Sequence, residues 1–147
     1  MNNQDQNQTF CIDDLIDELY IYVKKELQNA GKSNVNVEIY KKSREHTCRI
    51  QANRELLRQA LVHLLDNAVK YTDRGFIMFG YHVLDTNLVD FFVNDTGAGE
   101  YNDTVIDLSA VRDLLQQMGS RLKEEITGTG SSYSFSIKST VELTKIT

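Results

Sequence analysis

The sequence of 147 residues contains no proline and only two cysteines, Cys11 and Cys48. A disulfide-stabilised secreted chain of this size would carry more cysteines, so we expect two free thiols in a reducing cytosol. No apolar run approaches the roughly 18 residues that cross a bilayer. The first ten residues, MNNQDQNQTF, lack the basic and apolar segments of a secretion signal. These absences predict a cytoplasmic chain without direct insertion into a membrane.

A basic stripe is also missing, and the formal net charge is -5. This balance argues against a general nucleic-acid-binding protein, but it is compatible with a nucleotide site, where a few local donors suffice. With 41% hydrophobic residues, the chain can bury the core of one ordinary domain. We expect a short disordered tail over residues 1–10 and one domain over residues 11–147.

Three segments have the apolar spacing of amphipathic helices. The first covers residues 11–30 and ends at Gly31. The second begins after Asn53, a suitable N-cap, and runs to about Tyr71. The third runs from Leu108 to Met118 and is followed by a glycine.

Alternating or apolar runs predict six strands, over residues 35–40, 48–50, 76–83, 88–93, 121–126 and 132–137. We expect the short second run to pair with the first, and the other four to form two antiparallel hairpins. The second of these hairpins turns at residues 128–130, a Gly-Thr-Gly string that lacks the lysine and the following helix of a phosphate loop. Helices and strand pairs come in blocks, which predicts an α+β two-layer sandwich: a mixed, mostly antiparallel sheet packed on three helices.

A polar stripe lies along the second predicted helix. His63, Asn67 and Lys70 are spaced i, i+4 and i+7, so they share one narrow face. Such a stripe either faces solvent or lines a cleft. In a cleft, the Asn67 amide oxygen could hold Mg²⁺, which prefers hard oxygen ligands, and Lys70 could meet phosphate oxygens.

A glycine-containing loop follows the fourth predicted strand. Its sequence, DTGAG over residues 95–99, places the Asp95 carboxylate where a strand ends. That carboxylate can accept a hydrogen bond from an exocyclic amine, and Gly97 and Gly99 allow the backbone to approach a flat ligand closely. A turn without a ligand is the alternative interpretation.

The two elements together resemble a known family. The string LVHLLDNAVKYT over residues 61–72, followed by VNDTGAG over residues 93–99, is similar to the N box and the G1 box of the ATPase (HATPase_c) domains of bacterial sensor histidine kinases. These domains belong to the Bergerat-type, or GHKL, group. The flanking segments over residues 50–61 and 108–137 also resemble the family, so the similarity covers roughly residues 12–138.

On the helix side, the resemblance implies that Asn67 coordinates an Mg²⁺ ion bound to the ATP phosphates. It implies that Lys70 contacts phosphate and that Tyr71 lines the nucleotide cleft. His63 stands where many members have an asparagine. Imidazole is a poor Mg²⁺ ligand beside an amide oxygen, so we expect His63 to touch phosphate or to fill space.

On the strand side, the resemblance implies that Asp95 hydrogen-bonds the adenine amino group and that Gly97 and Gly99 flank the base. Ser132 stands where the family often has a threonine near the adenine. The implied ligands are therefore ATP and Mg²⁺.

The chain departs from the family after Gly99. Members usually carry a long ATP lid there, with a phenylalanine and a glycine string that offers N–H groups to phosphates. Here the short stretch of residues 100–107 contains neither residue type. Asp107 adds negative charge near the expected phosphates, although its more natural role is to cap the third helix. We expect an intact adenine side and a weakened phosphate side.

No phosphoacceptor histidine on a dimerisation helix is evident, since His46, His63 and His82 lie in a turn, the second helix and a strand. The resemblance implies a transferase of phosphorelay signal transduction in a two-component system. In that role the chain would donate the ATP γ-phosphoryl group to a histidine on a separate dimerisation domain, and a response regulator would receive the group from that histidine. The chain could then be the cytosolic part of a membrane-bound sensor. The degenerate lid leaves two alternatives open, a pseudokinase-like binding module and a serine kinase of the anti-sigma-factor type.

Overall fold

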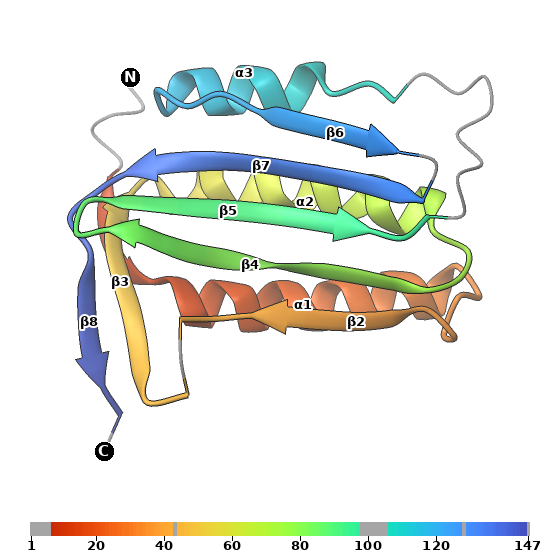
Figure 1. Cartoon of the computed structure of the whole chain (residues 1–147), viewed down its shortest axis with the longest axis horizontal. Coiled ribbons are helices and arrows are strands. Elements are labelled where there is room, and N and C mark those ends of the chain that lie inside the picture. The colour runs from red at the N-terminus through yellow and green to blue at the C-terminus, as the bar shows by residue number, and fades with distance from the viewer. Residues whose placement is uncertain (1–6, 43, 98–105, 128, 147) are drawn as a thin grey trace.

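The computed structural model describes residues 7–42, 44–97, 106–127 and 129–146, and these form two layers, with helices on one face of a five-stranded sheet (Figure 1). A second, three-stranded sheet stands at one end. No helix in these ranges is long and apolar enough to cross a membrane. In chain order the elements are β1 (Gln8–Cys11), α1 (Ile12–Asn29), β2 (Asn36–Tyr40), β3 (His46–Ala52), α2 (Arg54–Tyr71), β4 (Phe76–Asp85), β5 (Leu88–Asp95), α3 (Ser109–Gln117), β6 (Lys123–Thr127), β7 (Gly130–Lys138) and β8 (Glu142–Lys145).

The five-stranded sheet has the order β2-β4-β5-β7-β6. Only β2 and β4 are parallel, and the other neighbours in this sheet are antiparallel. Both predicted hairpins are present, and β6 and β7 meet at the Thr127–Gly130 pair. The predicted α+β sandwich is therefore confirmed.

The three-stranded sheet differs from the sequence-based expectation. Its order is β1-β3-β8, so β3 pairs with the two ends of the chain and not with β2. Residues 8–10 belong to β1 and not to a disordered tail, because Phe10 is buried opposite Ile50. The short run at Cys48 could not reveal these partners, since they lie dozens of residues away on either side.

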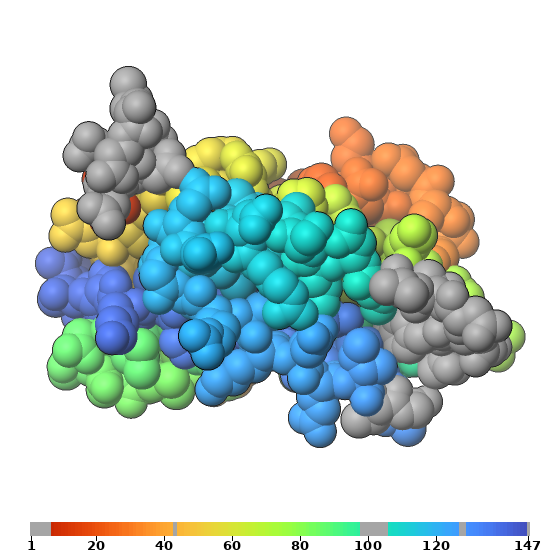
Figure 2. Space-filling model, turned by 90° about the horizontal axis from the view of Figure 1, so that it is seen from above, coloured from red at the N-terminus to blue at the C-terminus, as the bar shows by residue number. Residues whose placement is uncertain are grey.

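The three helices begin and end within two residues of their predicted positions. On α1, six apolar residues at helical spacing are buried, and each burial is worth about 1.5–3 kcal/mol relative to exposure. These residues are Ile12, Leu15, Ile16, Leu19, Val23 and Leu27. The Asn53 side chain caps α2 as expected, because its Oδ1 accepts a hydrogen bond from the Leu56 amide at 3.1 Å. Seen from above, α3 and β6 lie next to each other in the middle of one face (Figure 2).

Inward-facing aromatic residues fill the space between the sheet and the helices. The rings of Phe91 and Phe135 stack with centroids 5.5 Å apart. The buried Asp13 carboxylate joins three elements, because it accepts hydrogen bonds from the Tyr81 hydroxyl and the Cys48 amide, both at 2.7 Å. Burial and the nearby Asp13 charge raise the pKa of the Cys48 thiol to about 12, so this thiol stays protonated at neutral pH.

Candidate functional site

The polar stripe of α2 is at the surface, at the end of the helix that leads into β4. His63 and Lys70 are exposed, whereas Asn67 and Tyr71 are half-buried. The Lys70 ammonium nitrogen lies 5.2 Å from the centroid of the Tyr71 ring, within the range of a cation–π contact. The stripe therefore presents an amide, a cation and an aromatic ring on adjoining turns.

The Asp95 side chain lies at the end of β5 and is only 6% exposed. Its Oδ1 accepts a hydrogen bond from the Gly97 amide at 2.9 Å, which holds the first turn of the DTGAG loop. A carboxylate can accept several hydrogen bonds, so the same group can hold the loop and a ligand amine together. Gly97 is buried, and Gly99 lies outside the described residues.

Two glycines to which the sequence assigned no role in the site lie against Asp95 and Thr96, Gly75 against the Thr96 side chain and Gly130 against the backbone. A Cβ atom on Gly75 would lie 2.0 Å from the Thr96 hydroxyl oxygen, and one on Gly130 would lie 2.0 Å from the Asp95 carbonyl oxygen. Both distances are far below van der Waals contact. Gly75 also has φ +97°, a conformation that disfavours other residues. Only glycine at these two positions lets the neighbouring turns approach Asp95 this closely.

Thr96 joins the loop to the turn that follows α2. Its hydroxyl oxygen accepts a hydrogen bond from the Phe76 amide at 2.8 Å, and its own amide donates to the Phe76 carbonyl at 3.0 Å. Because Phe76 is the first residue of β4, this pair of bonds fixes the Asp95 end of β5 against the segment that leaves Tyr71. The two predicted halves of the site are thus held to one another.

The structure places Ser132 opposite Asn94, the neighbour of Asp95, and not opposite Asp95 itself. Ser132 pairs with Asn94 in the sheet, and its hydroxyl donates to the Asn94 side-chain oxygen at 2.7 Å, on the face away from the helices. Ser131 pairs with Asp95 and is 5% exposed. The alternation of the buried residues Tyr133, Phe135 and Ile137 would have indicated this, because residue 131 shares their face and residue 132 does not.

Two buried hydroxyl groups in this region lack a hydrogen-bond partner among the described residues, those of Thr72 and Tyr133. Burial is the main cause that raises the pKa of Tyr133, and the negative charge of Asp95 raises this pKa further. The Ser131 side chain lowers the pKa of Tyr133, although it does not form a hydrogen bond with the hydroxyl. An unsatisfied buried hydroxyl costs about 1–3 kcal/mol. A polar ligand group that reached these hydroxyls would relieve that cost.

The start of α3 is held by Asp107, although the N-cap position itself is Leu108. The Asp107 carboxylate accepts hydrogen bonds from the Ser109 amide at 2.9 Å and from its hydroxyl at 2.6 Å. The hydrogen bond from the Ser109 hydroxyl is the main cause that lowers the pKa of Asp107, and the bond from the Ser109 amide lowers it further. Asp107 therefore caps α3 as predicted, but from the position before the N-cap. Its carboxylate places a negative charge at the start of this helix.

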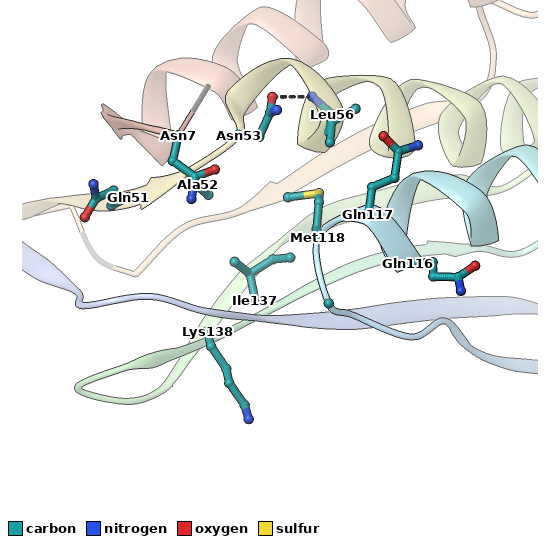
Figure 3. A pocket seen from close by; sticks show the side chains of 11 residues that line it. Asn7, Gln51, Ala52, Asn53, Leu56, Gln116, Gln117, Met118, Ile137 and Lys138 are labelled. Carbon is teal, nitrogen blue, oxygen red and sulfur yellow. Dashed lines mark hydrogen bonds between the residues drawn. The ribbon is translucent and has the colours of Figure 1, made fainter. Parts of the chain in front are cut away.

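Two cavities differ in their relation to these residues. A cavity of about 340 Å³ is lined by Asp95, Thr96, Ser131 and Ser132, among others. A second, of about 390 Å³, lies between the first turn of α2 and the last turn of α3, and side-chain amides including Gln51, Gln116 and Gln117 line it (Figure 3). None of the predicted site residues that the structure describes lines the second cavity.

The chain was compared with known protein families, sequences and structures. No protein-family model matches the chain. A segment of 84 residues, 57% of the chain, is 34% identical to the sensor histidine kinase SpaK of Bacillus subtilis, and it spans 18% of that protein's length.

Solved structures resemble almost the whole chain. The catalytic domain of histidine kinase ThkA aligns with a TM-score of 0.70 at 20% identity, covering 92% of this chain and 99% of that one. Full-length ShkA, solved in complex with AMPPNP, aligns with a TM-score of 0.77 at 22% identity, covering 94% of this chain and 32% of that one. The mycobacterial sensor histidine kinase MprB aligns with a TM-score of 0.70 at 14% identity, covering 91% and 98%. At these identities the structural likeness shows that the chain has the fold of histidine kinase catalytic domains, and the partial sequence match is to a protein of the same kind.

Proposed function

We propose that this chain is the ATP-binding catalytic domain of a two-component sensor histidine kinase. The observation that carries the proposal is the buried Asp95 carboxylate, fixed at the end of β5 by Gly97 and Thr96 and contacted through its backbone by Gly130. A rigid acceptor of this kind suits the exocyclic amine of adenine. ShkA, which shares the fold, was solved with the nucleotide analogue AMPPNP.

The residues beside Asp95 fit an adenine nucleotide. The unsatisfied hydroxyls of Thr72 and Tyr133 offer further polar contacts, and the half-buried ring of Tyr71 offers an apolar one. Gly97 and Gly99 would flank the base. In this proposal Ser131, and not Ser132, is the serine on the adenine side.

On the phosphate side, Asn67 would supply an amide oxygen to Mg²⁺, and Lys70 would contact phosphate oxygens as a point charge. His63, exposed one turn before Asn67, would touch phosphate or fill space. Bound Mg²⁺ would neutralise charge on the phosphates during transfer, and positioning would supply the rest of the catalysis.

The γ-phosphoryl group would go to a histidine on a separate dimerisation domain, and from there to a response regulator. The matched segment covers 18% of SpaK, so these partners belong to the proposal. Of the chain's own histidines, His46 lies in β3, His63 on α2 and His82 in β4. We propose a cytoplasmic site of action without nucleic acid.

A nucleotide-binding module without turnover is a second candidate. The observation that favours it is the Asp107 carboxylate at the start of α3, in a segment that lacks the family's glycine string. A helix N-terminus is otherwise a natural phosphate site. A carboxylate there occupies the same donors and repels phosphate.

Calorimetric titration with ATP and ADP, with and without Mg²⁺, tests the proposal. Wild-type protein should bind ATP, and Asp95→Asn should weaken binding by about tenfold or more, the equivalent of about 1.4 kcal/mol. Asp90→Asn is the matched control, because Asp90 lies on the same strand but on the opposite face, where its carboxylate accepts a hydrogen bond from Ser136. The control should bind like wild type.

The outcomes separate the candidates. Absence of binding at millimolar nucleotide would refute the proposed function. Equal affinities for ATP and ADP, indifferent to Mg²⁺, would favour the module without turnover. Phosphoryl transfer from radiolabelled ATP to an added dimerisation domain would establish the kinase.

A further inference from the structure

The C-terminal end of α2 is held by a lysine from a distant segment. Lys32 lies in the loop between α1 and β2, and its ammonium group donates to the carbonyl oxygens of Val69 at 2.8 Å and Lys70 at 3.1 Å. It also forms an ion pair with Asp73 at 3.0 Å. The Lys32 side chain is 19% exposed and its bond to the Val69 carbonyl is partly buried, whereas the Asp73 side chain is 67% exposed.

The position of this ammonium group has an electrostatic consequence. The last carbonyls of a helix lack partners within it and carry the negative end of the helix dipole. Lys70 is the basic residue in the last turn of α2. Without Lys32, the Lys70 ammonium would be a cation of the same turn able to turn back onto those carbonyls.

We propose that Lys32 is a positioning residue for nucleotide binding: it occupies the C-terminal carbonyls of α2 and thereby leaves the Lys70 ammonium directed toward the phosphates of the ligand. This inference rests on the proposed function. It assigns a role in phosphate recognition to a residue that lies 38 positions from Lys70 in the sequence.

The loop that carries Lys32 also reaches the strand side of the site. The Asn34 side chain donates to the Asp73 carbonyl at 3.4 Å, and the Asn36 amide donates to the Gly75 carbonyl at 2.9 Å. The next residue, Phe76, bonds Thr96 beside Asp95. The α1–β2 loop and the start of β2 therefore support both the Lys70 side and the Asp95 side of the proposed site.

A purely stabilising role for Lys32 predicts something different from a positioning role. If Lys32 only strengthens the fold, its loss weakens all ligands alike. If it keeps Lys70 available, its loss weakens ligands with phosphates and spares those without them. The ratio of ATP affinity to adenosine affinity distinguishes the two.

The experiment compares Lys32→Met, Lys32→Arg and Lys41→Met in the full chain, with ATP and adenosine titrated by calorimetry. Lys41→Met removes the same charge at a distance from the cleft, where Lys41 pairs with Asp17. We expect Lys32→Met to lower ATP affinity roughly fivefold or more, with adenosine affinity within about twofold of wild type. Lys32→Arg and Lys41→Met should keep the wild-type ratio. An equal loss of both ligands in Lys32→Met would overturn the inference.

A second measurement needs no nucleotide and separates this inference from the proposed function. The Thr72 amide donates to the Ala68 carbonyl at 3.0 Å, so its hydrogen exchange reports the order of the last turn of α2. Exchange should be faster in Lys32→Met and unchanged in Lys32→Arg. If wild-type protein bound no ATP, the proposed function would fail. Wild-type exchange at Thr72 in Lys32→Met would overturn the positioning role on its own.

Discussion

The two ends of α2 are built in different ways. At the first end, the Asn53 side chain caps the helix from three residues away, through the Leu56 amide. At the last end, the carbonyls of Val69 and Lys70 are held by Lys32, which is 37 and 38 positions away. The locally capped end borders the amide-lined cavity of Figure 3, and the end held by tertiary contacts carries the candidate ligand residues. Substitutions at the first end should therefore change stability alone, and those at the last end should also change binding.

The largest expected effect is at the turn after the last end of α2. Gly75→Ala combines a left-handed backbone with a contact of 2.0 Å to the Thr96 hydroxyl oxygen. We expect the free energy of unfolding to fall by roughly 2–4 kcal/mol, and nucleotide affinity to fall as well, because Thr96 holds the Asp95 loop. Urea unfolding and calorimetry measure the two effects.

Gly119→Ala is the control for backbone strain alone, since Gly119 has φ +70° with nothing within 4 Å of an added Cβ. It should cost only about 1–2 kcal/mol and leave binding unchanged. Adding Thr96→Ala to Gly75→Ala should recover part of the loss, with a coupling of about 1 kcal/mol. Strict additivity of the two substitutions would contradict the proposed clash.

A smaller effect is expected at the first end of α2. Asn53→Ala removes the N-cap and should lower the free energy of unfolding by about 1 kcal/mol. Because Asn53 lies at the opposite end of the helix from Lys70, ATP affinity should stay at the wild-type value in a calorimetric titration. A loss of affinity comparable with that of Lys32→Met would break the distinction between the two ends.

The smallest effect is a pH dependence at the first end. Glu18 on α1 accepts hydrogen bonds from Arg58 and Arg54, at 2.7 and 3.2 Å. The Arg58 contact is the main cause that lowers the pKa of Glu18 from its ordinary value of 4.5. The carboxylate therefore stabilises the fold above pH 4.5, and this contribution is lost as the pH falls through the lower folded-state pKa.

The Glu18 side chain is 44% exposed, so solvent screens the pair, and we expect Glu18→Gln to cost roughly 0.5 kcal/mol near neutral pH. The difference between variant and wild type should shrink as the pH falls below 4.5, and it should vanish once the glutamate is protonated in both states. Urea unfolding near neutral pH and at a pH below this transition measures it. A difference that persists at the lower pH would show that packing, and not charge, is responsible.

The elements that the sequence predicted are those with strong local signals. The helices of α1 and α2 follow from apolar residues at helical spacing, and the cap from Asn53. The DTGAG loop was predicted at the end of its strand, and Asp95 lies there. The small sheet was predicted less well, because β3 pairs with strands at the two chain ends. Local patterns contain no information on such distant pairing.

The amphipathic helices, the hairpins and the resemblance that carries Asn67, Lys70, Tyr71 and Asp95 could be read from the sequence alone, because each depends on spacing within a short segment. The tertiary structure was needed to show that Lys32 holds the last turn of α2, that Gly75 lies against the Thr96 side chain, and that Gly130 lies against the Asp95–Thr96 backbone. It also placed Ser131, and not Ser132, on the face of Asp95. These contacts join segments far apart in the chain, and they form only once the sheet register and the packing of α1 against α2 are set.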